Sequence, residues 1–102
     1  MSTVPMAQPS DVRVEQDLQA CPRVAKMFKL QWEEVQQSWV LLYPEGMVKL
    51  NGSAGEIMSR LDGNTSIQTL ISTLEQQFET IGLQADVLDF LTIAKRQGWV
   101  KL

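Results

Sequence analysis

The chain has 102 residues, of which 44% are hydrophobic and 21% charged, and its formal net charge is -3. This length fits one domain with a small core, and the acidic balance argues against nucleic acid as the main partner, because binding to a phosphate backbone needs a field of Lys and Arg. The absence of histidine removes the commonest general base and the commonest metal ligand. No stretch reaches the roughly 20 apolar residues that a membrane-spanning helix needs.

Residues 1–22 are predicted to be a flexible tail, anchored near its end at residues 22–24. The tail contains three prolines among polar residues and shows no steady apolar period. It also lacks the basic start and apolar block of a secretory signal. The single cysteine, Cys21, has no CxxC partner and cannot form an internal disulfide, so a reducing, cytoplasmic setting is expected. Residues 23–102 are predicted to form the domain.

Three strands joined by tight turns are predicted at the start of the domain. Apolar and polar residues alternate over 28–32, which is the period of a half-buried strand. Residues 39–43 are continuously apolar, which indicates a central strand buried on both faces. The Pro-Glu-Gly sequence at 44–46 supplies a turn, in which proline presets φ and glycine accepts φ > 0 at no steric cost. Residues 47–50 are a short third strand, so the three strands form an antiparallel meander.

Three short helices are predicted after the sheet. Asn51 and Ser53 can each cap the first helix, and Ser53 followed by Glu56 matches a capping box. The second helix opens at residues 64–66 and continues with apolar residues at helical spacing. The third begins with acidic residues in its first turn and ends at Gly98, which takes the usual C-cap role. A meander followed by a three-helix bundle is an α+β fold.

The sequence shows no catalytic or metal site. Without histidine, with one cysteine and without a close set of inward-facing Asp or Glu, no triad, dyad or metal cage can be assembled. Gly52 and Gly55 lie near the start of a helix but lack the Lys and the Ser or Thr of a phosphate-binding loop. The chain is therefore predicted not to be an enzyme, and no cofactor is expected.

A small sheet beside three helices also suits a winged-helix nucleic-acid-binding protein, in which the third helix would read DNA. Its exposed early positions are Gln84, Asp86 and Asp89, and carboxylates repel phosphates. Lys95 and Arg96 come only in the last turn, where they complement the helix C-terminus. Nucleic-acid binding is kept as the alternative, and a small scaffold within a larger enzyme is a third hypothesis.

The third helix and the third strand together suggest a binding groove. Apolar residues cover well over half of the circumference of the helix, so it either packs deep in the core or lines a groove for a partner. The strand at 47–50 has an outer edge with free amide and carbonyl groups, although its Lys49 also fits ordinary edge protection. An open edge beside an apolar helix suits the addition of a peptide as a further strand. Proline at Val48 is expected to remove a backbone donor from this edge.

Several segments together resemble the pyrroloquinoline quinone biosynthesis protein D (PqqD) family, over roughly residues 22–102. The most specific of them is LLYPEG at 41–46, followed by Leu50-Asn51. The further matching positions are Pro22-Arg23, Leu30-Gln31-Trp32, Leu50-Asn51, Ile57, Leu61-Asp62-Gly63, the stretch 86–91 and Gly98-Trp99.

The resemblance implies a winged-helix-like fold and a small non-catalytic chaperone in pyrroloquinoline quinone (PQQ) biosynthesis. Such a chaperone is a recognition element of a modified-peptide (RiPP) pathway. It would take a PqqA-like precursor peptide as an added strand and present it to a PqqE-like radical S-adenosylmethionine enzyme, which joins a glutamate and a tyrosine of the peptide. Carried over to this sequence, the peptide-binding residues are Met47, Val48, Lys49, Leu50, Val87, Phe90, Leu91, Ala94 and Lys95. The same edge and groove equally suit a second copy of the chain, as in a homodimer.

Overall fold

The structure, a computed structural model, describes residues 18–102. Its elements are, in chain order, β1 (Arg23–Val24), β2 (Lys29–Glu33), β3 (Ser38–Tyr43), β4 (Gly46–Lys49), α2 (Gly52–Met58), α3 (Ile67–Gln77), α4 (Gln84–Arg96) and β5 (Val100–Lys101). Strands β2, β3 and β4 form a three-stranded antiparallel sheet, and the three helices follow it, so the predicted α+β fold is confirmed. None of the described helices is long and apolar enough to cross a membrane.

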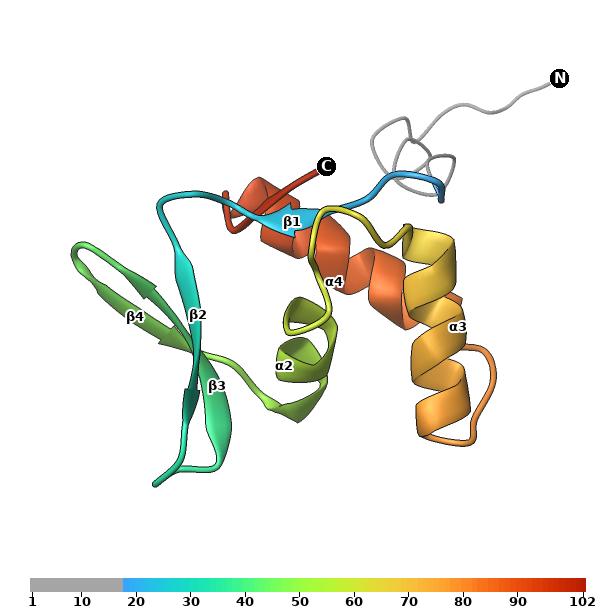
Figure 1. Ribbon diagram of the computed structural model, residues 1–102, viewed down its shortest axis with the longest axis horizontal. Helices are drawn as coiled ribbons and strands as arrows, with labels where there is room; N and C mark the ends of the chain where they lie inside the picture. Colours follow the sequence, from blue (N-terminus) through green and yellow to red (C-terminus); the bar gives the residue numbers. More distant parts are fainter. Residues whose placement is uncertain (1–17) are drawn as a thin grey trace, which may run out of the picture.

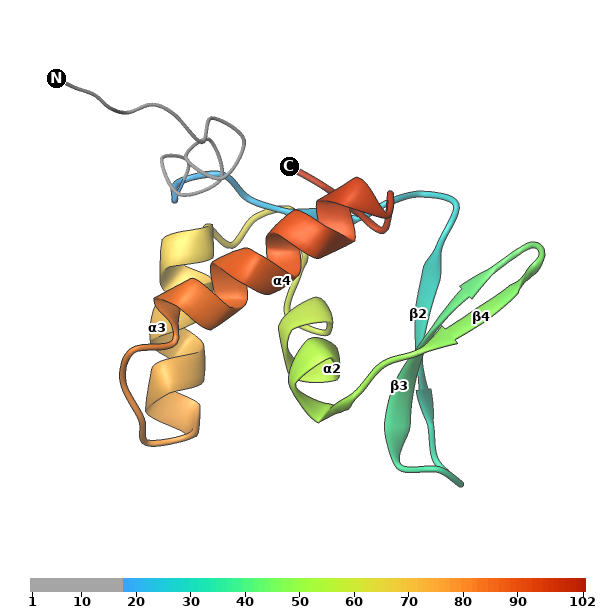
Figure 2. The ribbon, with the colours of Figure 1, turned by 180° about the vertical axis from the view of Figure 1, so that it is seen from behind.

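The sheet and α3 lie at opposite sides of the molecule, with α2 between them (Figure 1). Helix α4 runs from α3 toward the sheet and lies in front in the reverse view (Figure 2). The turn between β3 and β4 projects away from the helices, whereas the end of β4 leads directly to α2 (Figure 1). Only the last part of β4 therefore comes close to the helices.

Alternation along the strands places one set of apolar side chains on the face that meets the helices. Leu41 of β3 stands opposite Leu30 of β2 and Val48 of β4, and all three pack in one core cluster. Trp39 stands opposite Trp32, and their ring centroids lie 5.4 Å apart in an edge-to-face arrangement. These cross-strand pairs fix the register of the sheet, because a shift by one residue would turn every apolar side chain to the other face.

The central strand β3 is buried on both faces only at its middle. Val40 and Leu41 point to opposite faces and are both fully buried. Leu41 lies on the face that meets the helices. Val40 lies on the outer face, between Gln31 of β2 and Lys49 of β4. The neighbouring residues of β3 are half-buried, so the prediction of burial on both faces holds for the centre of the strand.

The turn at 44–46 forms as predicted, but Gly46 does not adopt the positive φ that is open to a glycine. Gly46 is the first residue of β4 and pairs with Tyr43, and its φ lies outside the left-handed region. In a turn with proline at the second position, glycine takes the fourth position, where φ is ordinary. Its small size matters instead, because an added Cβ would lie 3.4 Å from Oη of Tyr43.

Helix α2 begins earlier than the capping box predicted. The side chain of Asn51 accepts a hydrogen bond of 2.8 Å from the Ala54 amide, so Asn51 is the N-cap. The Ser53 hydroxyl donates to the Asn51 side chain, and the Glu56 carboxylate forms an ion pair with Arg60 at 2.7 Å. The capping-box assignment was wrong because Asn51 is the last extended residue before the helix, and its side chain reaches the free amides first.

The ends of the other helices agree with the sequence. Ser66 caps α3 by accepting a hydrogen bond from the Thr69 amide. Gly98 follows α4 with φ +83, the left-handed conformation that a glycine adopts without steric cost. Between α2 and α3, the Asp62 carboxylate accepts hydrogen bonds from the backbone amides of Asn64 and Thr65, each 2.8 Å long.

A second, two-stranded sheet ties the two ends of the described chain together. Strand β1 pairs antiparallel with β5, so that Val24 stands opposite Val100. The anchor predicted near residues 22–24 and the extended segment predicted after Gly98 are thus one feature.

Part of the predicted tail packs against the domain. Leu18 and Ala20 contact the core, and their carbonyl groups accept hydrogen bonds of 2.9 Å from the amides of Gln68 and Ile67 at the start of α3. Residues 1–17 of the predicted tail lie outside the described residues.

Two clusters of apolar side chains make up the core. One lies among the three helices and includes Ile57, Leu70 and Leu91. The other lies between the sheet, α2 and the end of α4, and includes Leu41 and Met58. Leu61 and Phe90 pack against both clusters, so the sheet and the helices are joined through shared side chains.

Candidate binding groove

The outer edge of β4 is open. Within residues 18–102, β4 pairs only with β3. The Leu50 amide donates to the Trp39 carbonyl at 3.0 Å, which makes Leu50 and Trp39 a hydrogen-bonded pair. In an antiparallel ladder such pairs alternate with pairs that exchange no hydrogen bonds, so Val48 also turns its N–H and C=O groups toward β3. Met47 and Lys49 therefore direct their N–H and C=O groups outward.

This alternation corrects the expectation for proline at position 48. The Val48 amide faces Leu41 in the ladder with β3, so proline there would break the sheet internally. The donor at the open edge beside the helices is the amide of Lys49. The sequence alone did not show which amides of β4 point outward. Alternating apolar and polar residues indicate which face of the sheet each side chain occupies, but not the direction of each amide.

A groove of about 290 Å³ lies beside this edge, between the end of β4, the start of α2 and α4. Its apolar lining includes Val48, Leu50, Ile57, Phe90, Ile93 and Trp99. Lys49, Asn51, Ser53 and Asp86 supply its polar groups. Apolar walls with a few polar groups are typical of a site that binds apolar side chains and orients them by hydrogen bonds.

Helix α4 serves the core and the groove with two different stripes of residues. Val87, Leu91 and Ala94 are only 2%, 1% and 0% exposed and belong to the core. Phe90 and Ile93 come one position earlier in each turn, about 100° around the axis, and they line the groove. Phe90 is half-buried, because it also packs against both core clusters, whereas Ile93 is 46% exposed.

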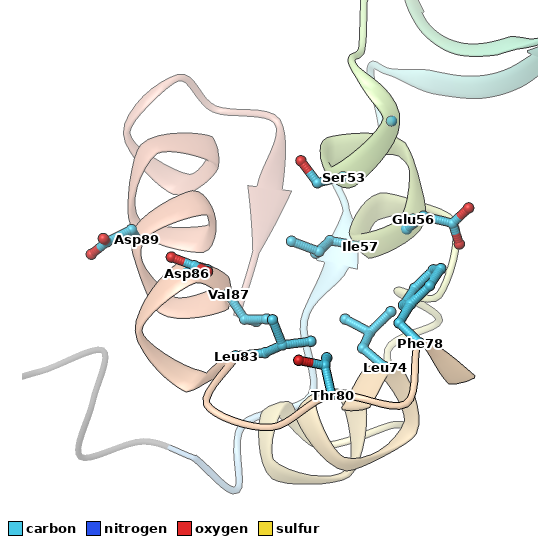
Figure 3. A pocket seen from close by; sticks show the side chains of 11 residues that line it. Ser53, Glu56, Ile57, Leu74, Phe78, Thr80, Leu83, Asp86, Val87 and Asp89 are labelled. Carbon is cyan, nitrogen blue, oxygen red and sulfur yellow. The ribbon is translucent and has the colours of Figure 1, made fainter. Parts of the chain in front are cut away.

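A larger hollow of about 670 Å³ lies between α2, α3 and α4. Figure 3 shows Ile57, Leu74 and Leu83 converging in it from α2, α3 and the loop before α4. Asp86 and Asp89 lie at its α4 side, where the Asp89 side chain points away from Ile57 and Leu74 (Figure 3). Ser53, Ile57 and Asp86 line both the hollow and the groove, so the two depressions adjoin one another.

Comparisons with known proteins agree on one family. The family model described as "Coenzyme PQQ synthesis protein D (PqqD)" matches residues 38–100. A protein of Azotobacter vinelandii named "PqqA binding protein" is 44% identical over 89 residues, which is 86% of this chain and 97% of that protein. The chain belongs to the PqqD family.

Further relatives and one solved structure support the same assignment. A "PqqA binding protein" of Pseudomonas aeruginosa is 43% identical over 86 residues, covering 83% of this chain and 94% of its own length. The solution structure of the PqqD truncation of Methylobacterium extorquens PqqCD, described as a stand-alone RiPP recognition element, matches with a TM-score of 0.67. It is 24% identical, covers 79% of this chain and 88% of its own, and so shows a shared PqqD fold.

The structure places the predicted site residues of this PqqD protein in three different settings. Val48, Leu50 and Phe90 line the groove with their neighbour Lys49, and Met47 lies just before them on the open edge. Val87, Leu91 and Ala94 lie in the core beneath the groove-lining stripe. Lys95 is exposed and lies about 200° from Ile93 around the helix axis, away from the groove lining.

Seven residues that line the groove of this PqqD protein were absent from the prediction, namely Asn51, Ser53, Ala54, Ile57, Asp86, Ile93 and Trp99. The signal for two of them is present in the sequence. Asp86, Phe90 and Ile93 follow one helical stripe, and Val87, Leu91 and Ala94 follow the next, and only the second is apolar throughout. A stripe that is apolar throughout is typical of the core. The neighbouring stripe, which contains Asp86, is therefore the better candidate for a binding surface. Trp99 had no comparable signal, because its position depends on the turn after α4.

Proposed function

We propose that this protein binds a precursor peptide in PQQ biosynthesis, and that the peptide joins the sheet as a strand along β4. The observation that carries the proposal is the outward N–H and C=O groups of Met47 and Lys49, next to an apolar groove. Open edges with this arrangement pair readily with an extended chain. The names of the relatives, which refer to PqqA binding, support a peptide as the ligand.

In this proposal the backbone and the groove have different tasks. The backbone groups of Met47 and Lys49 hold the peptide through main-chain hydrogen bonds, which depend little on its sequence. Val48, Leu50 and Phe90, together with Ile93 and Trp99, receive every second side chain of the peptide and so select its sequence. The buried residues Val87, Leu91 and Ala94 act from inside, because they fix the position of α4. Lys95 lies outside this contact.

The proposed mechanism is positional. A bound peptide has a high effective concentration at the enzyme that modifies it, and its reactive residues enter in a fixed order. The PqqD protein itself makes and breaks no bond, and it hands the peptide to a PqqE-like radical S-adenosylmethionine enzyme in the cytoplasm. Without peptide, the same edge pairs with a second copy of the chain.

Backbone amide shifts during titration with a synthetic PqqA peptide test the proposal. The amides of Met47 and Lys49 and those of Phe90 and Ile93 are expected to shift, and the shifts should saturate together. Saturable binding that leaves β4 and α4 unchanged would rule out strand addition at this site. Duplex DNA in a salt series serves as the control for the alternative, because a nucleic-acid-binding protein would bind it with an affinity that falls steeply as salt rises.

A further inference from the structure

We infer that the hollow between α2, α3 and α4 is a second docking surface, which takes an apolar side chain flanked by Lys or Arg on the enzyme that receives the peptide. The inference rests on the proposed function for the identity of this partner. It rests on the hollow itself for the chemistry of the contact.

The interior of the hollow is apolar and is left open. Ile57, Leu74, Leu83 and Val87 line it, and its volume of about 670 Å³ exceeds the 290 Å³ of the groove. Phe78 lines its rim with 49% of its surface exposed, and Ile81 in the same α3–α4 connection is 88% exposed. Contiguous apolar surface of this kind on a small domain marks an interaction site for another protein.

The charges around the hollow indicate the sign of the charge on the segment that binds there. Its lining contains three carboxylates, those of Glu56, Asp86 and Asp89, and no Lys or Arg. Glu56 is neutralised by the ion pair with Arg60. Asp86 and Asp89 form no ion pair with any residue of 18–102. The field of these two carboxylates attracts a cationic segment and repels phosphate or an acidic one, which gives the contact its specificity.

The position of the hollow suits a partner that must meet the peptide. Ser53, Ile57 and Asp86 separate the hollow from the groove and line both. A protein that inserts a side chain into the hollow therefore lies directly beside a peptide held on β4. The two ligands occupy adjoining surfaces, so both can be bound at once, as the transfer of a peptide from adaptor to enzyme requires.

Matched pairs of variants test the inference without touching the groove. Phe78→Ala removes a side chain that lines the hollow and is 49% exposed, and Val35→Ala is its control, which removes an exposed apolar side chain in the β2–β3 loop. Asp89→Lys reverses one charge of the hollow, and Glu45→Lys makes the same change at the β3–β4 turn. Each variant is titrated by calorimetry with the synthetic PqqA peptide and, with and without that peptide, with the purified PqqE-like enzyme.

Phe78→Ala and Asp89→Lys are each expected to raise the dissociation constant for the enzyme about tenfold, since loss of an apolar contact or of a facing charge has effects of this size. Their peptide affinities, and both affinities of the two control variants, are expected to stay within about twofold of wild type. Three results would overturn the inference: equal enzyme affinity in all four variants, a parallel loss of peptide affinity, or no binding of the enzyme to the wild-type protein. Failure of the proposed function has a different signature, because the wild-type protein would then not bind the peptide.

Discussion

Gly55 lies where α2 crosses β3, and its lack of a side chain lets the two elements approach closely. A Cβ at this position would lie 2.7 Å from Cδ1 of Trp39, well inside van der Waals contact. Gly55→Ala is therefore expected to lower the free energy of unfolding by about 1–3 kcal/mol, the usual effect of overpacking a core. Urea denaturation followed by tryptophan fluorescence measures this loss.

Gly52→Ala is the matched control within the same helix. A Cβ at Gly52 would meet no heavy atom within 4 Å. Because alanine favours a helix over glycine, this change should leave the stability unchanged or raise it by up to about 1 kcal/mol. Equal destabilisation by the two substitutions would show that the contact with Trp39 does not limit the size of residue 55.

Asp62 makes the stability depend on pH. The backbone amides of Asn64 and Thr65 donate to its carboxylate and hold the pKa of Asp62 below its ordinary value of 3.8. The folded protein thus binds this proton more weakly than the unfolded chain does. The stabilisation is complete above the unfolded pKa and is lost as the pH falls through the lower folded pKa.

Asp62→Asn removes this titration and keeps an oxygen that accepts hydrogen bonds. Between about pH 5 and pH 2 the free energy of unfolding of the variant is expected to fall less than that of the wild type. Urea unfolding at a series of pH values gives both curves. Parallel curves would mean that the hydrogen bonds to Asp62 add nothing to acid sensitivity.

At the scale of elements, α4 carries two functions on neighbouring stripes. Val87 is buried in the core, whereas Ile93 is half exposed and lines the groove. Val87→Ala is expected to lower the free energy of unfolding by about 2 kcal/mol, because it leaves a cavity, while the folded fraction binds peptide as before. Ile93→Ala is expected to weaken peptide binding several-fold with a much smaller loss of stability.

Calorimetric peptide titration and urea unfolding of the same two variants separate these effects. If Val87→Ala weakened the peptide contact while Ile93→Ala left it intact, the assignment of the two stripes would have to be reversed. Loss of both properties in both variants would show that the core and the groove of α4 are not separable.

Element identity followed from the sequence, but the direction of side chains and amides did not. Alternation from Phe28 to Trp32 predicted β2, and the run of apolar residues with Ser66 before it predicted α3. The first helix began earlier than expected, because Asn51 and Ser53 are both good caps and only the path of the chain decides between them. The outward amide at Lys49 depends on the register with β3, which a short strand does not specify by itself.

At the scale of the whole molecule, the pairing of β1 with β5 brings the two ends of the described chain, residues 18–102, together, and the groove and the hollow both lie against α2 and α4. Strand β5 is held by its pairing with β1, and Trp99 directly precedes β5. Trp99 therefore lines the groove although it follows the last helix. The groove at the sheet edge and the hollow among the helices adjoin at Ser53, Ile57 and Asp86. In the proposed function, the groove receives the peptide and the adjoining hollow receives the second protein.

The measurement that tests strand addition most directly is the peptide dissociation constant of Lys49→Pro compared with that of Lys49→Ala. Proline removes the outward amide and spares the ladder with β3, because Lys49 and Val40 are a pair without hydrogen bonds. Alanine removes the side chain and keeps the amide. The dissociation constant is expected to rise about tenfold for Lys49→Pro and to stay within about threefold of wild type for Lys49→Ala. Wild-type affinity in a folded Lys49→Pro variant would contradict pairing of the peptide with β4.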